Sequence, residues 1–211
     1  MPKTEPFEKL TDHYDAWFEE HSGVYAEELE AIRRIMPPFK KGVEIGVGTG
    51  RFAAPLGIGL GLEPSKKMAQ KAKERGIGIV EGCAEAVPLP DGCCDLALFV
   101  TTICFVDDVE KALGEIYRIL QPGGHIVVGF VDRETPLGRK YQEHKEQSRF
   151  YKAARFFSAA EVLELLKKSG FTECVAVQTL FGPDLEHMKG GIKEGFGEGA
   201  FVAMRCKKPD A

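Results

Sequence analysis

Three alternate glycines follow a short apolar segment, and this pattern constrains the fold more than any other in the chain. Residues 42–47 read Gly-Val-Glu-Ile-Gly-Val, and Gly46, Gly48 and Gly50 lie in the turn that follows. A buried strand ending in such a turn lets the backbone bend sharply and lets a ligand lie against bare main chain. The alternative is a plain strand-to-helix turn without a ligand.

Short apolar segments alternate with helical patterns over most of the chain. Further strands are expected at about 59–62, 77–80, 96–101, 125–131, 172–180 and 199–206. Helices are expected at about 24–36, 65–75, 108–120 and 158–170, the third opening on an Asp107/Glu110 capping box and the fourth on Ser158 and Glu161. Such alternation favours a parallel sheet, and no helix separates the last two strands. We therefore predict a doubly wound α/β fold: a mostly parallel, seven-stranded sheet with helices on both faces and an antiparallel last strand.

The length of 211 residues indicates a single domain with four parts. Residues 1–40 form an N-terminal helical cap, and residues 41–131 form the ligand-binding core. Residues 132–157 leave the carboxyl end of a strand, where α/β sheets bind ligands, so we interpret them as a lid insertion. Residues 158–211 supply the last helix and strands.

The composition argues against several classes of partner. The chain has 28 Lys+Arg against 32 Asp+Glu, a net charge of −4, which disfavours a nucleic acid partner. No apolar segment approaches the roughly 18 residues of a membrane span, and the N-terminus lacks a secretory signal. We expect a cytoplasmic protein that binds no membrane. The sequence leaves its oligomeric state open.

The six cysteines are expected to be reduced thiols, because no secretory signal accompanies them. The sequence contains neither a Cys-x-x-Cys pair nor Cys and His residues at the spacing of metal ligands, so it predicts no metal site. The adjacent Cys93 and Cys94 raise the alternative of metalloid chemistry, which this absence of ligand spacing disfavours.

Two acids near the glycine turn indicate the chemistry of the ligand. Glu44, two residues before the first glycine, is costly to bury unless it meets a cation or hydrogen-bond donors. It would repel the pyrophosphate of a dinucleotide and attract an ammonium group. Glu63 ends the next strand, where an acid accepts hydrogen bonds from both ribose hydroxyls.

With three later motifs, these residues resemble the class I S-adenosylmethionine-dependent methyltransferases, and among them the type 11 group that includes ubiquinone and menaquinone methyltransferases. The order is Glu-x-Gly-x-Gly-x-Gly, a strand-end Glu, Ala-Glu-x-x-Pro-Leu-Pro-Asp-Gly, Asp-Leu-Ala-Leu and Ile-Leu-Gln-Pro-Gly-Gly, over about residues 40–131. The resemblance implies a Rossmann-like fold, S-adenosyl-L-methionine as cofactor and S-adenosyl-L-homocysteine as product.

By position, the resemblance implies that Glu44 anchors the methionine end of the cofactor and that Glu63 binds the ribose hydroxyls. The other implied cofactor-binding residues are Gly46, Gly48 and Gly50 at the floor, Cys83, Ala84 and Glu85 at the adenine, and Thr101, Thr102 and Tyr14 around the sulfonium. Two features depart from the family. Cys83 stands where an acid is usual, and only residues 51–56 precede the second strand. We therefore expect an intact but slightly rearranged pocket.

Methyl transfer from a sulfonium is an in-line displacement that needs alignment and water exclusion, and a base only when the acceptor must lose a proton. The catalytic residue is not identified by the sequence, and the candidates are Tyr14, His13, Tyr141 and His144. We expect a small-molecule acceptor, with amine, hydroxyl, carbon and thiol all open. A non-catalytic methyltransferase-like binding protein is one alternative. A nicotinamide-dependent oxidoreductase is another, which would leave Glu44 unexplained.

Overall fold

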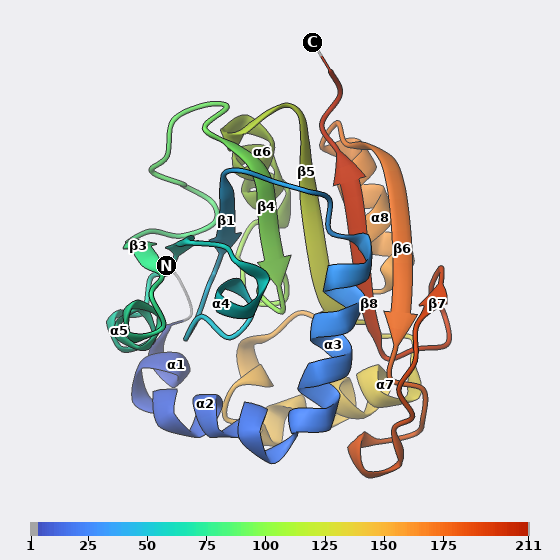
Figure 1. Ribbon diagram of the computed structural model, residues 1–211. Coiled ribbons are helices and arrows are strands. Elements are labelled where there is room, and N and C mark those ends of the chain that lie inside the picture. Colours follow the sequence, from blue (N-terminus) through green and yellow to red (C-terminus); the bar gives the residue numbers. More distant parts are fainter. Residues whose placement is uncertain (1–3, 211) are drawn as a thin grey trace.

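The computed structural model describes residues 4–210, in which eight strands form one mixed sheet (Figure 1). The strand order is β3-β2-β1-β4-β5-β8-β6-β7, and the first five of these are parallel, whereas β8 is antiparallel to both β5 and β6. The strands are β1 (Gly42–Ile45), β2 (Leu60–Leu62), β3 (Gly78–Val80), β4 (Cys94–Val100), β5 (Leu120–Val131), β6 (Thr172–Thr179), β7 (Lys193–Glu194) and β8 (Phe201–Lys207).

The predicted doubly wound sheet with an antiparallel last strand is confirmed, but its strand count is corrected from seven to eight. The additional strand is β7, whose Lys193 and Glu194 pair with Gln178 and Val177 of β6. Both residues of β7 are exposed and polar, so no apolar pattern marks this strand in the sequence.

Helices cover both faces of the sheet (Figure 1). They are α1 (Glu5–Lys9), α2 (Thr11–Glu20), α3 (Ser22–Ile35), α4 (Ala53–Leu56), α5 (Lys66–Glu74), α6 (Val109–Ile119), α7 (Pro136–Glu143) and α8 (Ala159–Lys168). Because α3 packs with one hydrophobic cluster and α6 and α8 with the other, the sheet is buried between two layers. Helix α4 has only four residues, as expected from the short segment before β2.

The central strand β4 shows why this sequence forms a sheet buried on both sides. Leu96, Leu98 and Val100 pack on the α3 side, while Ala97 and Phe99 pack on the α6 side. All five are at most 2% exposed. Side chains of a strand alternate between faces, so a continuous apolar segment satisfies both layers at once.

The N-terminal ends of two helices test the predicted caps. The Ser158/Glu161 capping box of α8 is present. Helix α6 is capped by Asp108, one residue later than predicted, and its side chain accepts from the Lys111 N–H. The predicted capping role of Asp107 is therefore wrong, and the backbone N–H groups of both Asp107 and Asp108 donate to Glu85 of another loop.

The expectation that all cysteines are reduced is corrected by a disulfide between Cys174 and Cys206. These cysteines lie on β6 and β8, which are neighbours in the sheet. Val175 pairs with Arg205, and continuing that antiparallel register by one residue places Cys174 opposite Cys206. Such pairing depends on which distant strands are adjacent, so the spacing of 32 residues does not reveal it.

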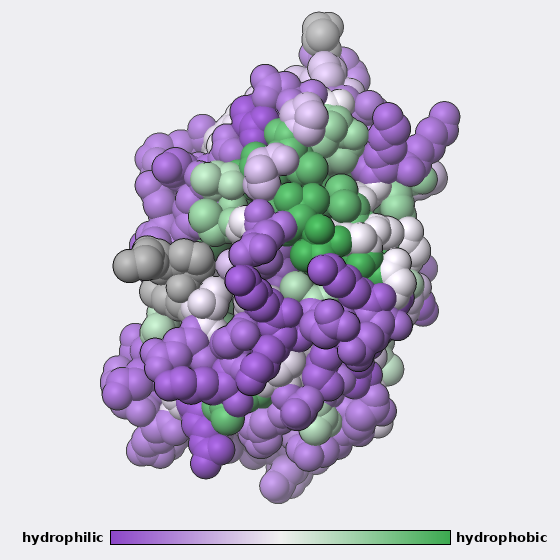
Figure 2. All heavy atoms as spheres, turned by 90° about the vertical axis from the view of Figure 1, so that its left-hand side faces the viewer, coloured by the Kyte–Doolittle hydropathy of each residue, from purple (hydrophilic) through white to green (hydrophobic). Residues whose placement is uncertain are grey.

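Helices α1, α2 and α7 lie at the edge of the sheet toward which β1 and β4 point (Figure 1). Figure 2 shows the β3 side of the molecule, where an apolar patch in the upper half contrasts with a mostly hydrophilic lower half. Within residues 4–210, no helix combines the length and apolarity needed to cross a lipid bilayer.

Candidate functional site

The glycine turn after β1 has the conformation that its sequence predicts. Gly46, Gly48 and Gly50 have φ values of +69°, +56° and +84°, a region that L side chains rarely adopt. A Cβ on Gly46 would lie 2.4 Å from Cγ2 of Thr102, and one on Gly48 would lie 3.6 Å from the Tyr14 hydroxyl oxygen. Gly46 is therefore required by both its φ value and the close approach of Thr102, while at Gly48 the φ value alone favours glycine.

Glu63 is held at the end of β2 by two backbone donors. Its Oε2 accepts from the Gly48 N–H at 2.9 Å, and its Oε1 accepts from the Ser65 N–H at 2.8 Å. The residue is 7% exposed, and burial raises the pKa of its carboxyl group to about 7. Each oxygen can accept a further hydrogen bond, which suits a pair of adjacent hydroxyl groups.

Glu44 lies in the interior below the turn. It is 2% exposed, burial raises its pKa well above the usual range, and its carboxyl group accepts from the Ala53 N–H. Its Oε2 has no hydrogen-bond partner among the described residues. A buried carboxyl oxygen without a donor marks a place that a ligand group or a water molecule completes.

A cavity of about 270 Å³ opens beside the glycine turn, at the carboxyl ends of the strands. The predicted site residues that line it are Gly46, Gly48, Glu63, Cys83, Ala84, Glu85, Thr101, Thr102, Tyr14, His13 and Tyr141. They come from the core, from α2 and from α7, which the fold brings together around one space.

Three predicted site residues do not line this cavity. Glu44 and Gly50 lie behind the turn, where a Cβ on Gly50 would be 3.3 Å from Cα of Ala72. His144 is exposed on the far side of α7, with its Nδ1 at 2.9 Å from the Lys140 carbonyl oxygen. We therefore remove His144 from the candidates for catalysis.

The sequence analysis missed Glu28 of α3, which lines the cavity and is 6% exposed. Burial raises the pKa of its carboxyl group to about 8. The sequence does contain a signal, because Glu28 lies between Val24 and Ile32 on the apolar side of the helix, where a charge is costly. Phe150 and Tyr151 were also missed, since nothing local distinguishes them within the insertion.

Aromatic rings enclose the cavity on the side of the N-terminal helices. Phe7 contacts Phe105 and Phe150, with ring centroids 4.9 and 5.5 Å apart. Tyr151 stacks on Tyr141 with centroids 5.3 Å apart. Residues 132–157 thus pack their rings against those of α1 and of the loop after β4, and this packing limits the access of water.

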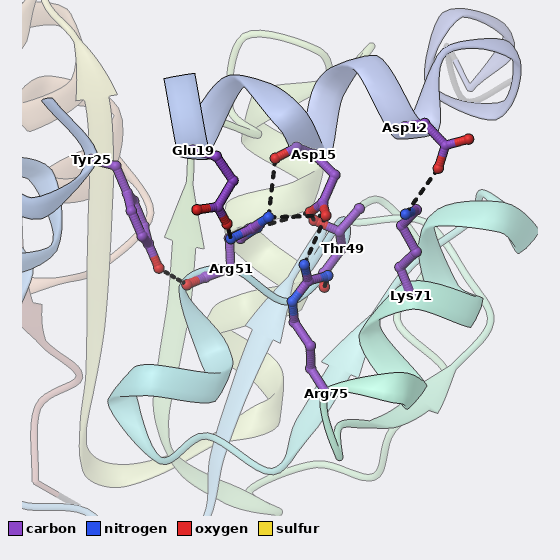
Figure 3. A network of polar contacts seen from close by, with 8 residues as sticks. All are labelled: Asp12, Asp15, Glu19, Tyr25, Thr49, Arg51, Lys71 and Arg75. Atoms are coloured by element: carbon purple, nitrogen blue, oxygen red, sulfur yellow. Dashed lines mark hydrogen bonds and ion pairs between the residues drawn. The ribbon is translucent and has the colours of Figure 1, made fainter. Parts of the chain in front are cut away.

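The helix that carries Tyr14 is fastened to the glycine turn by Asp15 (Figure 3). The Asp15 carboxylate accepts from Thr49 and Arg51 at 2.8 Å and from Arg75 at 2.8 Å. Although burial disfavours the charge, the hydrogen bonds from Arg51, Arg75 and Thr49 hold the pKa of Asp15 well below its usual range. The Tyr25 hydroxyl also donates to the Arg51 carbonyl oxygen. One carboxylate therefore joins α2 to the turn and to α5.

Comparison with known proteins agrees with this geometry. Residues 43–128 match the family model described as a methyltransferase domain. The chain is 43% identical over 202 residues to an uncharacterized protein of Methanocaldococcus jannaschii, covering 96% of this chain and 98% of the relative. It is 24% identical over 220 residues to the demethylmenaquinone methyltransferase of Anoxybacillus flavithermus, covering 86% and 92%.

A solved structure matches most of the chain. It is the crystal structure of a Thermotoga maritima SAM-dependent methyltransferase, a possible histamine N-methyltransferase, with 52% sequence identity and a TM-score of 0.92. The match covers 96% of this chain and 98% of the Thermotoga chain, so it includes the N-terminal helices and the insertion as well as the sheet.

Proposed function

This chain belongs to the S-adenosylmethionine-dependent methyltransferases, and we propose that it transfers the methyl group to a small-molecule acceptor bound in the cavity beneath α1 and α2. The cofactor of the family is S-adenosyl-L-methionine. The single observation that carries the proposal is that Glu63 and the glycine turn face a cavity whose other end is closed by aromatic rings.

The residues present fit this cofactor. Glu63 has acceptor capacity for two ribose hydroxyls, and Gly46 and Gly48 line the cavity, where the amino acid part of the molecule would lie. The unpartnered oxygen of Glu44 lies behind the same turn and suits the ammonium group through a bridging water. Cys83, Ala84 and Glu85 line the end of the cavity where adenine is expected.

Bound S-adenosylmethionine supplies an activated methyl group on a sulfonium. What the protein contributes is orientation, which can lower a barrier by about 7–11 kcal/mol when both reactants are held in line. The aromatic enclosure of Phe7, Phe105 and Phe150 excludes water from the cavity. Thr101 borders the cavity with a φ of +47°, and strained backbone of this kind gathers at functional sites.

A small molecule is the acceptor that this enclosure favours. The cavity lies under α2 and against the insertion, whereas a side chain of a folded protein needs an open approach. The related proteins named above include a possible histamine N-methyltransferase and a demethylmenaquinone methyltransferase, and both names refer to small acceptors.

Titration calorimetry tests the proposal. We expect S-adenosylhomocysteine to bind with a micromolar dissociation constant and NAD not to bind. Methyl incorporation from labelled cofactor should then be found in a library of small acceptors. Binding of NAD in place of S-adenosylhomocysteine would contradict the proposal, and tight cofactor binding with no incorporation across the library would favour a non-catalytic protein.

A further inference from the structure

Glu28 is a buried acid for which the protein supplies no partner. Its side chain lines the cavity, and no described residue donates a hydrogen bond to its carboxyl group. The preceding residue behaves differently, because the Glu27 carboxylate accepts from the Thr179 hydroxyl at 3.0 Å and from the Gly191 N–H at 2.9 Å. Burial of an unpaired carboxyl group costs stability, so Glu28 needs an explanation that the fold does not provide.

The cavity has the charge that a cation would require. Its described lining includes three acids, Glu28, Glu63 and Glu85, and neither Lys nor Arg. Glu63 is held by two backbone N–H groups, and Glu85 accepts from the backbone N–H of Asp107 at 2.7 Å. Glu28 is therefore the lining acid that remains available to a ligand.

Tyrosines from three segments surround the same space as Glu28. Burial raises the pKa values of Tyr14 in α2, Tyr141 in α7 and Tyr151, and the charge of Glu28 raises each of them further. Their hydroxyl groups therefore stay protonated and neutral. Their rings, with that of Trp17, offer faces that attract cations.

We propose that the acceptor is a cationic amine and that the Glu28 carboxylate both binds its ammonium group and removes one of its protons. The proposal rests on the proposed methyl transfer and specifies its acceptor. Glu28 on α3 supplies the negative charge, and the tyrosines enclose the space in which the amine would bind. The described lining contains no Lys or Arg that would compete with the amine for the carboxylate.

The proton step makes the amine reactive. One N–H bond of the ammonium group breaks, an O–H bond forms at an Oε atom of Glu28, and the electron pair of the broken bond stays on nitrogen. Inside an apolar cavity this exchange converts a desolvated ion pair into two neutral groups, which burial favours. The nitrogen lone pair so obtained is what methylation of an amine requires. The reaction gives one proton to solvent, the proton that Glu28 loses when the ammonium group binds, and the carboxyl group is again protonated when the product leaves, as in the empty protein.

A neutral acceptor fits the cavity less well. Burial keeps the Glu28 carboxyl group largely protonated in the empty protein, so an alcohol or a thiol would gain only a hydrogen bond between neutral groups from it. An ammonium group gains a charge-assisted hydrogen bond from the ionised carboxylate, which is the stronger interaction. An anionic acceptor would meet three acids and no basic residue in the described lining. A cation is the ligand class that satisfies the carboxylate.

Calorimetry on the protein saturated with S-adenosylhomocysteine tests the inference. The probes are histamine, 2-phenylethylamine and its uncharged counterpart 2-phenylethanol, measured with the wild type, Glu28→Gln and Glu30→Gln. Glu30 is an exposed acid on the same helix and is the matched control. We expect at least one amine to bind the wild type and the Glu30→Gln protein, to bind Glu28→Gln at least tenfold more weakly, and to bind more tightly than the alcohol.

Repeating the titrations in two buffers of different ionisation enthalpy counts protons. The wild type should release protons when the amine binds at pH 7, because its buried carboxyl group starts largely protonated, and Glu28→Gln should release none. A purely structural role of Glu28 would not produce this difference.

The outcomes separate the two proposals. If the wild type does not bind S-adenosylhomocysteine, the proposed function fails. If it does, but neither amine binds, or the amine affinity is the same in Glu28→Gln, the amine inference is overturned and the methyltransferase function stands. The affinity of Glu28→Gln for S-adenosylhomocysteine shows whether the variant has folded correctly.

Discussion

Two buried glutamates line one cavity and differ in the hydrogen bonds that the protein gives them. Glu63 receives hydrogen bonds from two backbone N–H groups, whereas Glu28 receives none from the described residues. Burial raises the pKa of both, to about 7 and about 8 respectively. The backbone donors orient the Glu63 carboxylate so that it can accept hydroxyl groups, whereas Glu28 has no protein partner and can pair with a charged group of a ligand.

The two glutamates also belong to different elements of the fold. Glu63 follows β2 of the central sheet, while Glu28 lies on α3, which continues the helices that cover the cavity. Those helices are joined to the core by the Asp15 network (Figure 3). The residues that we propose for the cofactor therefore belong to the sheet, and those that we propose for the acceptor depend on how the covering helices are attached.

The largest effect is expected from breaking that attachment. Asp15→Ala leaves Arg51 and Arg75 without their buried carboxylate and should lower the free energy of unfolding by about 3 kcal/mol, measured in urea. Asp12→Ala is the control, because Asp12 is 94% exposed and pairs only with Lys71, so about 1 kcal/mol or less is expected. Amine affinity should fall more than cofactor affinity in Asp15→Ala, and equal losses would contradict the division between the two ends.

The next effect concerns the cofactor end alone. Glu63→Ala removes the acceptor of both ribose hydroxyls and should weaken S-adenosylhomocysteine binding well over tenfold, which corresponds to about 2 kcal/mol. Glu28→Gln should leave this affinity within about threefold. Calorimetry measures both. An unchanged affinity in Glu63→Ala would mean that the ribose is held elsewhere.

A smaller effect follows from the pKa of Glu63. The ionised carboxylate is the better hydroxyl acceptor, and its pKa of about 7 in the empty protein means that protonation competes with binding. Affinity for S-adenosylhomocysteine should therefore fall about tenfold from pH 8 to pH 6. Measuring it in the Glu28→Gln background removes the other titrating acid of the cavity. In Glu63→Gln the affinity should be flat with pH, and persistence of the slope there would assign it to another group.

The smallest effect is on stability at the acceptor end. The folded pKa of Glu28, about 8, exceeds its unfolded value of 4.5, so the folded state holds the extra proton and the free energy of unfolding falls as pH rises between them. Glu28→Gln should flatten this fall and stabilise the empty protein by about 1 kcal/mol at pH 8. Thermal unfolding at pH 5 and pH 8 checks it. A variant less stable than the wild type at pH 8 would show that the carboxylate has partners after all.

The core of the fold was predictable because its signals are local. The glycine turn, the apolar strands and the helix caps at Ser65 and Ser158 each depend on a few neighbouring residues. Where a distant group intervened, the prediction failed. The carboxylate of Glu85, from another loop, accepts from the N–H groups of both Asp107 and Asp108, and the helix cap is Asp108 in place of the predicted Asp107. The disulfide was missed for the same reason, since it needs β6 and β8 to be neighbours.

The site residues also differ in how far their positions depend on distant parts of the chain. The residues that we propose for the cofactor, Gly46, Gly48 and Glu63, occur within 18 residues of one another and directly follow two adjacent parallel strands. The acceptor end draws on α2, α3 and the insertion, and only folding brings these together. His144 was a reasonable candidate by residue type, but it follows α7 as an exposed residue, whereas Tyr141 within the helix lines the cavity.

The sequence alone predicted the class of fold from the alternation of strands and helices, and its resemblance to a known family predicted the cofactor, because the motifs that carry both lie in contiguous segments. The tertiary structure alone decided that Glu28 faces the cavity without a partner and that Asp15 holds the covering helices in place. The physical reason is that the cost of burying a charge depends on which donors surround it, and those donors come from segments far apart in the chain.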